Sequence, residues 1–162
     1  MTNCSHALLL FLVAAPAIAQ NFSARVISIA DGDTISVLRN GRPQRVRLNA
    51  IDCPESHQPF GTKAKQFTGD LAFGKVVTIR TVDVDRYGRI VADVILANGR
   101  NLNHELVKAG LAWWYQRYAP RDSVLEALEF AARKARTGLW VDPHAVAPWE
   151  WRKGVRAIGV SQ

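Results

Sequence analysis

The sequence is poor in cysteine, and it has no internal repeat, no low-complexity segment and no linker between two periodic regions. Its two cysteines are Cys4 and Cys53, and no signature places a histidine beside Cys53 as the base that a cysteine nucleophile requires. We therefore expect Cys53 to be a small, buried residue. At 162 residues, 48% of them hydrophobic, the chain is long enough for one domain with a substantial core.

Long apolar runs are also scarce, and the chief one lies near the amino end. Residues 7–19 carry no charge and end in Ala-Ile-Ala before Gln20. The run is too short to span a bilayer comfortably and has the pattern of a signal peptide cleaved before Gln20, although the usual Lys or Arg ahead of it is missing. The alternative is a buried amino-terminal helix. Cleavage predicts a secreted or periplasmic protein with no membrane span in the mature chain, and without Cys4 an intramolecular disulfide is excluded.

Acidic residues are outnumbered by basic ones. The chain has 21 Lys and Arg against 14 Asp and Glu, which gives a net charge of +7, and residues 1–19 contribute none of it. A basic surface favours anionic partners, because binding releases counterions. Nucleic acid and an acidic membrane surface both fit this charge.

Five segments rich in Val and Ile have the pattern of β-strands. They are residues 24–30, 33–38, 42–51, 75–84 and 89–96. Asn40-Gly41 predicts a tight hairpin between the second and third, because both central positions of that turn require positive φ. Helical periodicity appears in residues 62–74, 102–109 and 123–136, with Asn101 as the cap of the second helix and Ser123 with Glu126 as a capping box of the third.

Five short strands with a helix between the third and the fourth are the order of a small closed barrel of the OB type. The sequence thus predicts an α+β fold in which polar loops gather at one rim of the barrel. Three polar segments could meet there: Asp31-Gly32-Asp33, the stretch from Arg47 to Glu55, and Asp85-Arg86-Tyr87-Gly88-Arg89. Loops at such a rim often bind nucleic acid.

Each of these polar residues has a chemical and a purely structural interpretation. Asp33 and Asp52 offer hard oxygen ligands that suit Ca²⁺ better than Zn²⁺, but either one could simply stabilise a turn. Arg47 and Arg89 could bind two phosphate oxygens each through the planar guanidinium group, or could form ordinary surface ion pairs. Glu55 could activate a water molecule, or be a solvated loop residue.

Taken together, the motifs DGDT (residues 31–34), RLNAIDCPE (47–55) and DRYGR (85–89) closely resemble staphylococcal nuclease, or thermonuclease. The resemblance covers most of the mature chain and continues through NHELVKAGLA (103–112) to the Gly138-Leu139-Trp140 end of the last helix. It implies a five-stranded OB-fold barrel with three α-helices. It also implies a Ca²⁺-dependent nuclease that cleaves DNA and RNA with little sequence preference and leaves 3′-phosphate ends.

The resemblance also implies a role for each matching residue. Calcium would be held by Asp33, Asp52 and the backbone carbonyl of Cys53. Arg47 and Arg89 would hold the scissile phosphate, and Glu55 would act as general base or orient the attacking water. Tyr87 would contact a substrate phosphate, and Tyr118 would contact a base or sugar. Gln116 stands where a second substrate-facing tyrosine is expected, and Trp113, Trp114 or Tyr115 could replace it by stacking.

The predicted organisation is a signal peptide (1–19), a nuclease OB-fold domain (20–141) and a carboxy-terminal arm (142–162) that is packed on the domain or partly disordered. The PWEWRKG segment of that arm, residues 148–154, is assigned no catalytic role. The substrates are DNA and RNA, with no stable protein partner and a monomeric state. The alternative function is a related OB-fold module that binds nucleic acid without catalysis, which would not need all five of the acids and arginines.

Overall fold

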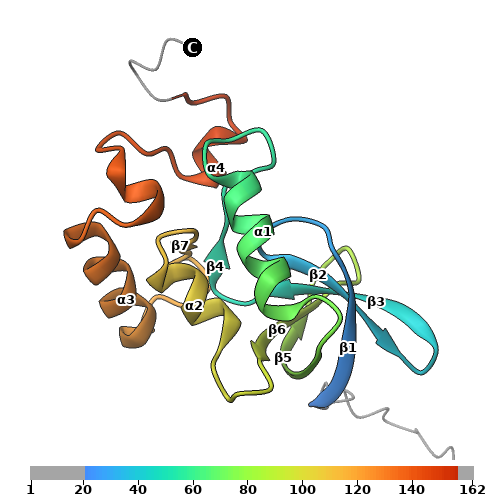
Figure 1. Cartoon of the computed structure of the whole chain (residues 1–162). Coiled ribbons are helices and arrows are strands. Elements are labelled where there is room, and N and C mark those ends of the chain that lie inside the picture. The colour runs from blue at the N-terminus through green and yellow to red at the C-terminus, as the bar shows by residue number, and fades with distance from the viewer. Residues whose placement is uncertain (1–20, 157–162) are drawn as a thin grey trace, which may run out of the picture.

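The five predicted strands close into a barrel in the computed structural model, which describes residues 21–156 (Figure 1). The predicted signal peptide, residues 1–19, lies outside the described residues. Neighbouring strands in the barrel follow the order β1-β2-β3-β6-β5. They are β1 (Phe22–Ile29), β2 (Thr34–Arg39), β3 (Arg42–Leu48), β5 (Val76–Val84) and β6 (Ile90–Ile95). The predicted OB-type barrel and the α+β class are confirmed.

The barrel interior is filled by every second residue of each strand, because successive side chains of a strand point to opposite faces. On β3, Val46 and Leu48 are almost fully buried, whereas Arg47 between them points outward at the rim. Arg47 lies opposite Thr34 on the antiparallel neighbour β2 and opposite Val91 on the parallel neighbour β6. The alternation that builds the core therefore also places an arginine beside the two rim loops that precede β2 and β6.

The hairpin between β2 and β3 forms as predicted. Asn40 and Gly41 both have positive φ, at 51° and 74°. This combination gives a two-residue turn whose twist matches that of the paired strands. The predicted third strand, in contrast, is wrong at its end: Ala50 has a φ of 60° and separates β3 from the short strand β4 (Ile51–Asp52).

The three predicted helices are present as α1 (Gly61–Ala72), α2 (Leu102–Lys108) and α3 (Ser123–Lys134). Asn101 caps α2, since its side chain accepts a hydrogen bond from the backbone nitrogen of Asn103. The predicted capping box of α3 is wrong. Asp122, one residue earlier, is the N-cap, and its Oδ1 accepts from the backbone nitrogens of Val124 and Leu125. Asp122 and Ser123 both have side chains that can cap a helix, and the structure uses the carboxylate of Asp122.

Four short elements were not predicted from the sequence: β4, its antiparallel partner β7 (Trp113–Trp114), the 3₁₀ turn η1 (Gly138–Val141) and the short helix α4 (Pro148–Trp151). In Figure 1, α2 and α3 lie together beside the barrel, and α4 lies near the start of α1. Within residues 21–156, no helix is both long and apolar enough to cross a membrane.

The capping geometry leads to a test with a matched pair of variants. Asp122→Ala is expected to lower the free energy of unfolding by about 1 kcal/mol, because two backbone donors at the start of α3 lose their acceptor. Ser123→Ala should change it by less than about 0.5 kcal/mol. Urea denaturation of both variants decides between the two caps, and a larger loss for Ser123→Ala would contradict the structure.

Candidate active site

The loop between β1 and β2 places a buried carboxylate, that of Asp33, at the rim of the barrel. Its Oδ2 accepts a 2.6 Å hydrogen bond from the backbone nitrogen of Cys53, and its Oδ1 pairs with Arg47. Gly32 allows this close approach, since a Cβ atom there would lie 2.7 Å from the Cβ of Ala64 and 2.8 Å from the Sγ of Cys53. The corner is therefore fixed against both α1 and the chain that follows β4.

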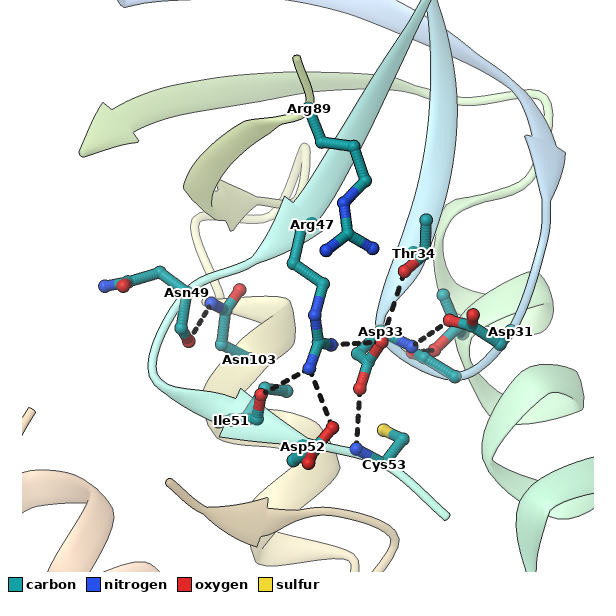
Figure 2. Close-up of polar contacts among 12 residues, drawn as sticks. Asp31, Asp33, Thr34, Arg47, Asn49, Ile51, Asp52, Cys53, Arg89 and Asn103 are labelled. Carbon is teal, nitrogen blue, oxygen red and sulfur yellow. Dashed lines mark hydrogen bonds and ion pairs between the residues drawn. The ribbon is translucent and has the colours of Figure 1, made fainter. Parts of the chain in front are cut away.

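Arg47 joins the two predicted metal ligands (Figure 2). One terminal nitrogen, Nη1, pairs with Asp33, and the other, Nη2, lies 2.7 Å from Oδ1 of Asp52 and 3.2 Å from the carbonyl oxygen of Ile51. Burial alone would favour the neutral form, but the carboxylates of Asp33 and Asp52 outweigh it and raise the pKa of Arg47 above its usual value. Arg47 is thus permanently charged and rigidly held.

Arg89 reaches the same rim from the turn that precedes β6. Asp85 fixes it twice: Oδ2 accepts from Nε of Arg89 at 2.6 Å, and Oδ1 accepts from the backbone nitrogen of Arg89 at 3.0 Å. Figure 2 shows the guanidinium group of Arg89 directed toward Arg47. Among residues 21–156, no partner engages the two terminal nitrogens of Arg89 by hydrogen bond or ion pair. These nitrogens are available to an anionic ligand.

All eight residues that the sequence assigned to a site border one cavity of about 410 Å³. They are Asp33, Arg47, Asp52, Cys53, Glu55, Tyr87, Arg89 and Tyr118. The side chains of Tyr87 and Tyr118 are largely exposed, whereas Asp33, Asp52 and Cys53 are buried. Cys53 is a buried residue as expected, and burial raises the pKa of its thiol, which makes it a poor nucleophile.

Beyond the eight assigned residues, the cavity is also lined by Thr34, Pro54 and Arg86. Four others contribute to the site, and of these only Tyr115 was assigned a possible role from the sequence, as a replacement for the missing tyrosine. Asp31 and Tyr115 line the cavity, Asp85 orients Arg89, and Arg152 reaches in from beyond α4. Asp31 and Asp85 stand inside recognised motifs, so the motifs themselves carried the signal for them. No local pattern in the sequence distinguishes Arg152 from the other arginines.

Of the residues that could replace the tyrosine missing at Gln116, Tyr115 lines the cavity. Its ring packs edge-to-face on Tyr118, with centroids 4.9 Å apart, and stacks on Trp149 at the same separation. The backbone nitrogen of Tyr115 donates to the carbonyl oxygen of Ala50 at 2.8 Å, which ties this segment to the start of β4. Gln116 is exposed and does not border the cavity.

Crowded carboxylates make the corner suitable for a hard cation. Burial first, and then the charge of Asp33, raise the pKa of Asp31 to about 6. Burial also raises the pKa of Asp52, while Arg152 and Arg47 lower it. In residues 21–156, no three side chains of His, Cys, Asp or Glu are grouped as a metal site. A site with two carboxylates, a carbonyl and otherwise water or substrate oxygens is compatible with that finding, and its oxygen donors fit Ca²⁺.

Comparison with known proteins shows which family this chain is similar to. The family described as "Staphylococcal nuclease homologue" matches residues 45–142. A protein named "Micrococcal nuclease" from Shigella flexneri is 42% identical over 156 residues, which cover 91% of this chain and 89% of the relative. An "Uncharacterized endonuclease" from Escherichia coli is 40% identical over 145 residues, or 90% of this chain and 94% of the relative. The chain therefore belongs to the staphylococcal nuclease family.

Proposed function

We propose that the protein is an exported, Ca²⁺-dependent nuclease that hydrolyses DNA and RNA with little sequence preference and leaves 3′-phosphate ends. The observation that carries the proposal is the convergence of Asp33, Arg47, Asp52, Glu55 and Arg89 on one cavity. Phosphodiester hydrolysis requires a positioned water, positive charge around the attacked phosphate and stabilisation of the leaving oxygen. The acids and arginines that border this cavity could meet each of these requirements.

The two arginines would divide the work of binding phosphate. The terminal nitrogens of Arg89 have no partner within residues 21–156, and its side chain is 27% exposed, so it can form a bidentate contact with phosphate oxygens. Arg47 is only 17% exposed and is already bound by Asp33 and Asp52. Its charge would act over a short distance, and it also sets the position of the two acids.

Glu55 is the acid best placed to activate water. Its side chain is 42% exposed and borders the cavity, whereas Asp33 and Asp52 are almost fully enclosed. Ca²⁺, when bound by Asp33, Asp52 and the carbonyl of Cys53, would supply positive charge that stabilises the phosphate as negative charge develops on it. Having only three protein ligands suggests weak binding of the ion, strengthened by substrate oxygens.

Two parts of the proposal rest on the sequence alone. The charge-free apolar segment before Gln20 supports export to the periplasm or the medium. Extracellular fluid is rich in calcium, which suits a site of low affinity. The net charge of +7 supports association with nucleic acid of either kind, and a monomer is sufficient because one chain supplies every proposed catalytic residue.

A digestion assay tests the proposal directly. Purified protein is expected to degrade single-stranded DNA, duplex DNA and RNA with Ca²⁺, and to stop when a chelator is added. The fragments should carry 5′-hydroxyl ends, which a polynucleotide kinase labels without prior phosphatase treatment. Intact DNA after long incubation with Ca²⁺ would instead support the alternative, a module that only binds nucleic acid, and cleavage in chelator would refute the metal dependence.

A further inference from the structure

The described part of the carboxy-terminal arm, residues 142–156, is fixed against the rim of the cavity by several contacts of different kinds. The side-chain nitrogen of Gln58 donates a 2.6 Å hydrogen bond to the carbonyl oxygen of Val146, and Pro148 is buried. Trp149 stacks on Tyr115, with an interplanar angle of 17°, and packs edge-to-face against Trp113. The position of α4 is therefore set by packing.

Because α4 is held in this position, the side chain of Arg152 lies against two acids of the cavity, Asp52 and Glu55. Nη1 of Arg152 lies 2.6 Å from Oε1 of Glu55, and Nη2 lies 2.8 Å from Oδ2 of Asp52. The guanidinium group thus spans the buried ligand candidate and the exposed base candidate. Asp52 is also bound by Arg47, whose Nη2 lies 2.7 Å from Oδ1, and Nη1 of Arg152 lies 3.5 Å from the same oxygen.

Glu55 depends on Arg152 more than Asp52 does. In the part of the chain that the structure describes, the carboxylate of Glu55 has no other side-chain partner, and its Oε2 accepts no hydrogen bond. A glutamate with three side-chain torsions on a half-exposed loop samples several rotamers unless a contact selects one. Arg152 selects the rotamer that faces the cavity and leaves Oε2 free.

We propose that Arg152 is a positioning residue of the nuclease site, which holds Glu55 in the orientation needed to engage a water molecule and which makes the arm part of the catalytic unit. This inference rests on the proposed function. The expectation that the PWEWRKG segment has no catalytic role would then be wrong. Two other roles compete with it: Arg152 could merely fasten the arm, or it could be a latch that keeps the acids blocked until it is displaced.

The three roles differ in what the loss of Arg152 does to turnover. We would compare Arg152→Ala and Arg152→Lys with Lys153→Ala, which removes the same charge from the next residue. Lys153 pairs with Glu150 and with no other acid in the described part of the chain. For Arg152→Ala we expect kcat to fall by about 10- to 100-fold with KM changed by less than about threefold, because a misplaced catalytic group costs rate and not binding. Lys153→Ala should stay within about twofold of the parent protein in both constants.

A double-mutant cycle with Glu55→Gln distinguishes an effect of Arg152 on Glu55 from a purely structural effect on the arm. If Arg152 acts through Glu55, the double variant should be no slower than Glu55→Gln alone, whereas independent effects would multiply. Arg152→Lys keeps the charge but cannot engage both carboxylates with one planar group, so its kcat should lie between those of Arg152→Ala and the parent protein. Thermal melting and the anisotropy of a labelled oligonucleotide, measured in chelator, report folding and binding without turnover.

The proposal is overturned by an Arg152→Ala variant that turns over as fast as Lys153→Ala, by one that turns over faster than the parent protein, or by losses that multiply in the cycle. If Arg152→Ala does not fold, Arg152→Lys decides, since a normal kcat in a folded Arg152→Lys protein also overturns it. Failure of the nuclease function itself is seen separately, as a parent protein that does not cleave DNA in Ca²⁺.

Discussion

Replacing Arg89 by alanine is expected to lower kcat by a factor of about 10³ while the protein remains folded, because one preorganised donor to the developing charge is lost. Arg89 carries the only guanidinium group among Arg47, Arg89 and Arg152 whose terminal nitrogens are both free in residues 21–156. Arg86 also lines the cavity, but one of its terminal nitrogens, Nη2, already donates to the hydroxyl of Tyr87 at 2.7 Å. Turnover of a defined oligonucleotide in Ca²⁺ measures the effect.

Two further variants, Arg89→Lys and Arg100→Ala, serve as comparisons in this experiment. Arg89→Lys keeps the charge and loses the planar fork, so it should recover only a small part of the rate if geometry matters. Arg100→Ala removes an arginine that pairs with Glu105, in the turn between β6 and α2, and should leave turnover unchanged. A rate for Arg89→Ala within tenfold of the parent protein would remove Arg89 from the mechanism.

Glu55→Gln is the second variant with a large expected effect. The amide has the same size as the carboxylate but cannot accept a proton from water, so kcat should fall by about 10²- to 10⁴-fold. The fold should survive, since Glu55 is half-exposed and lies outside the core. Rapid-quench single-turnover measurements at saturating enzyme separate this loss from any change in product release.

Glu105→Gln is the matched control for Glu55→Gln, because it removes one carboxylate that also pairs with an arginine, Arg100, but that does not border the cavity. It should cleave DNA at the parent rate. A normal single-turnover rate for Glu55→Gln would leave water activation to another group and would refute the assigned role, even if the protein remained an active nuclease.

Sequence patterns were sufficient for the parts of the molecule that depend on local chemistry. Residues 42–51 were recognised as a strand, whose alternation agrees with the burial of Val46 and Leu48 and the outward position of Arg47, and Asn40-Gly41 identified the hairpin. The three motifs identified residues that the barrel brings to one cavity, because each motif adjoins the end of a strand at the same rim. Such features need no knowledge of distant contacts.

Features that depend on long-range packing could not be predicted from the sequence. Arg152 meets Glu55 and Asp52 across about 100 positions of the chain, and packing of the arm, including the stacking of Trp149 on Tyr115, brings it there. The positive φ of Ala50 likewise depends on the pairing of β4 with β7, since alanine has no intrinsic preference for that conformation. The cap of α3 was missed because Asp122 and Ser123 are both good capping residues.

The place of Arg152 in the chain bears on how the protein is made. Ribosomes work from the amino end, so this arginine is the last of the cavity residues to be synthesised. Under the positioning role proposed for it, a nascent chain carries every other member of the site before Glu55 has its partner. The complete site can therefore form only after the chain has been synthesised through Arg152, because Glu55 and Asp52 lack this contact until then.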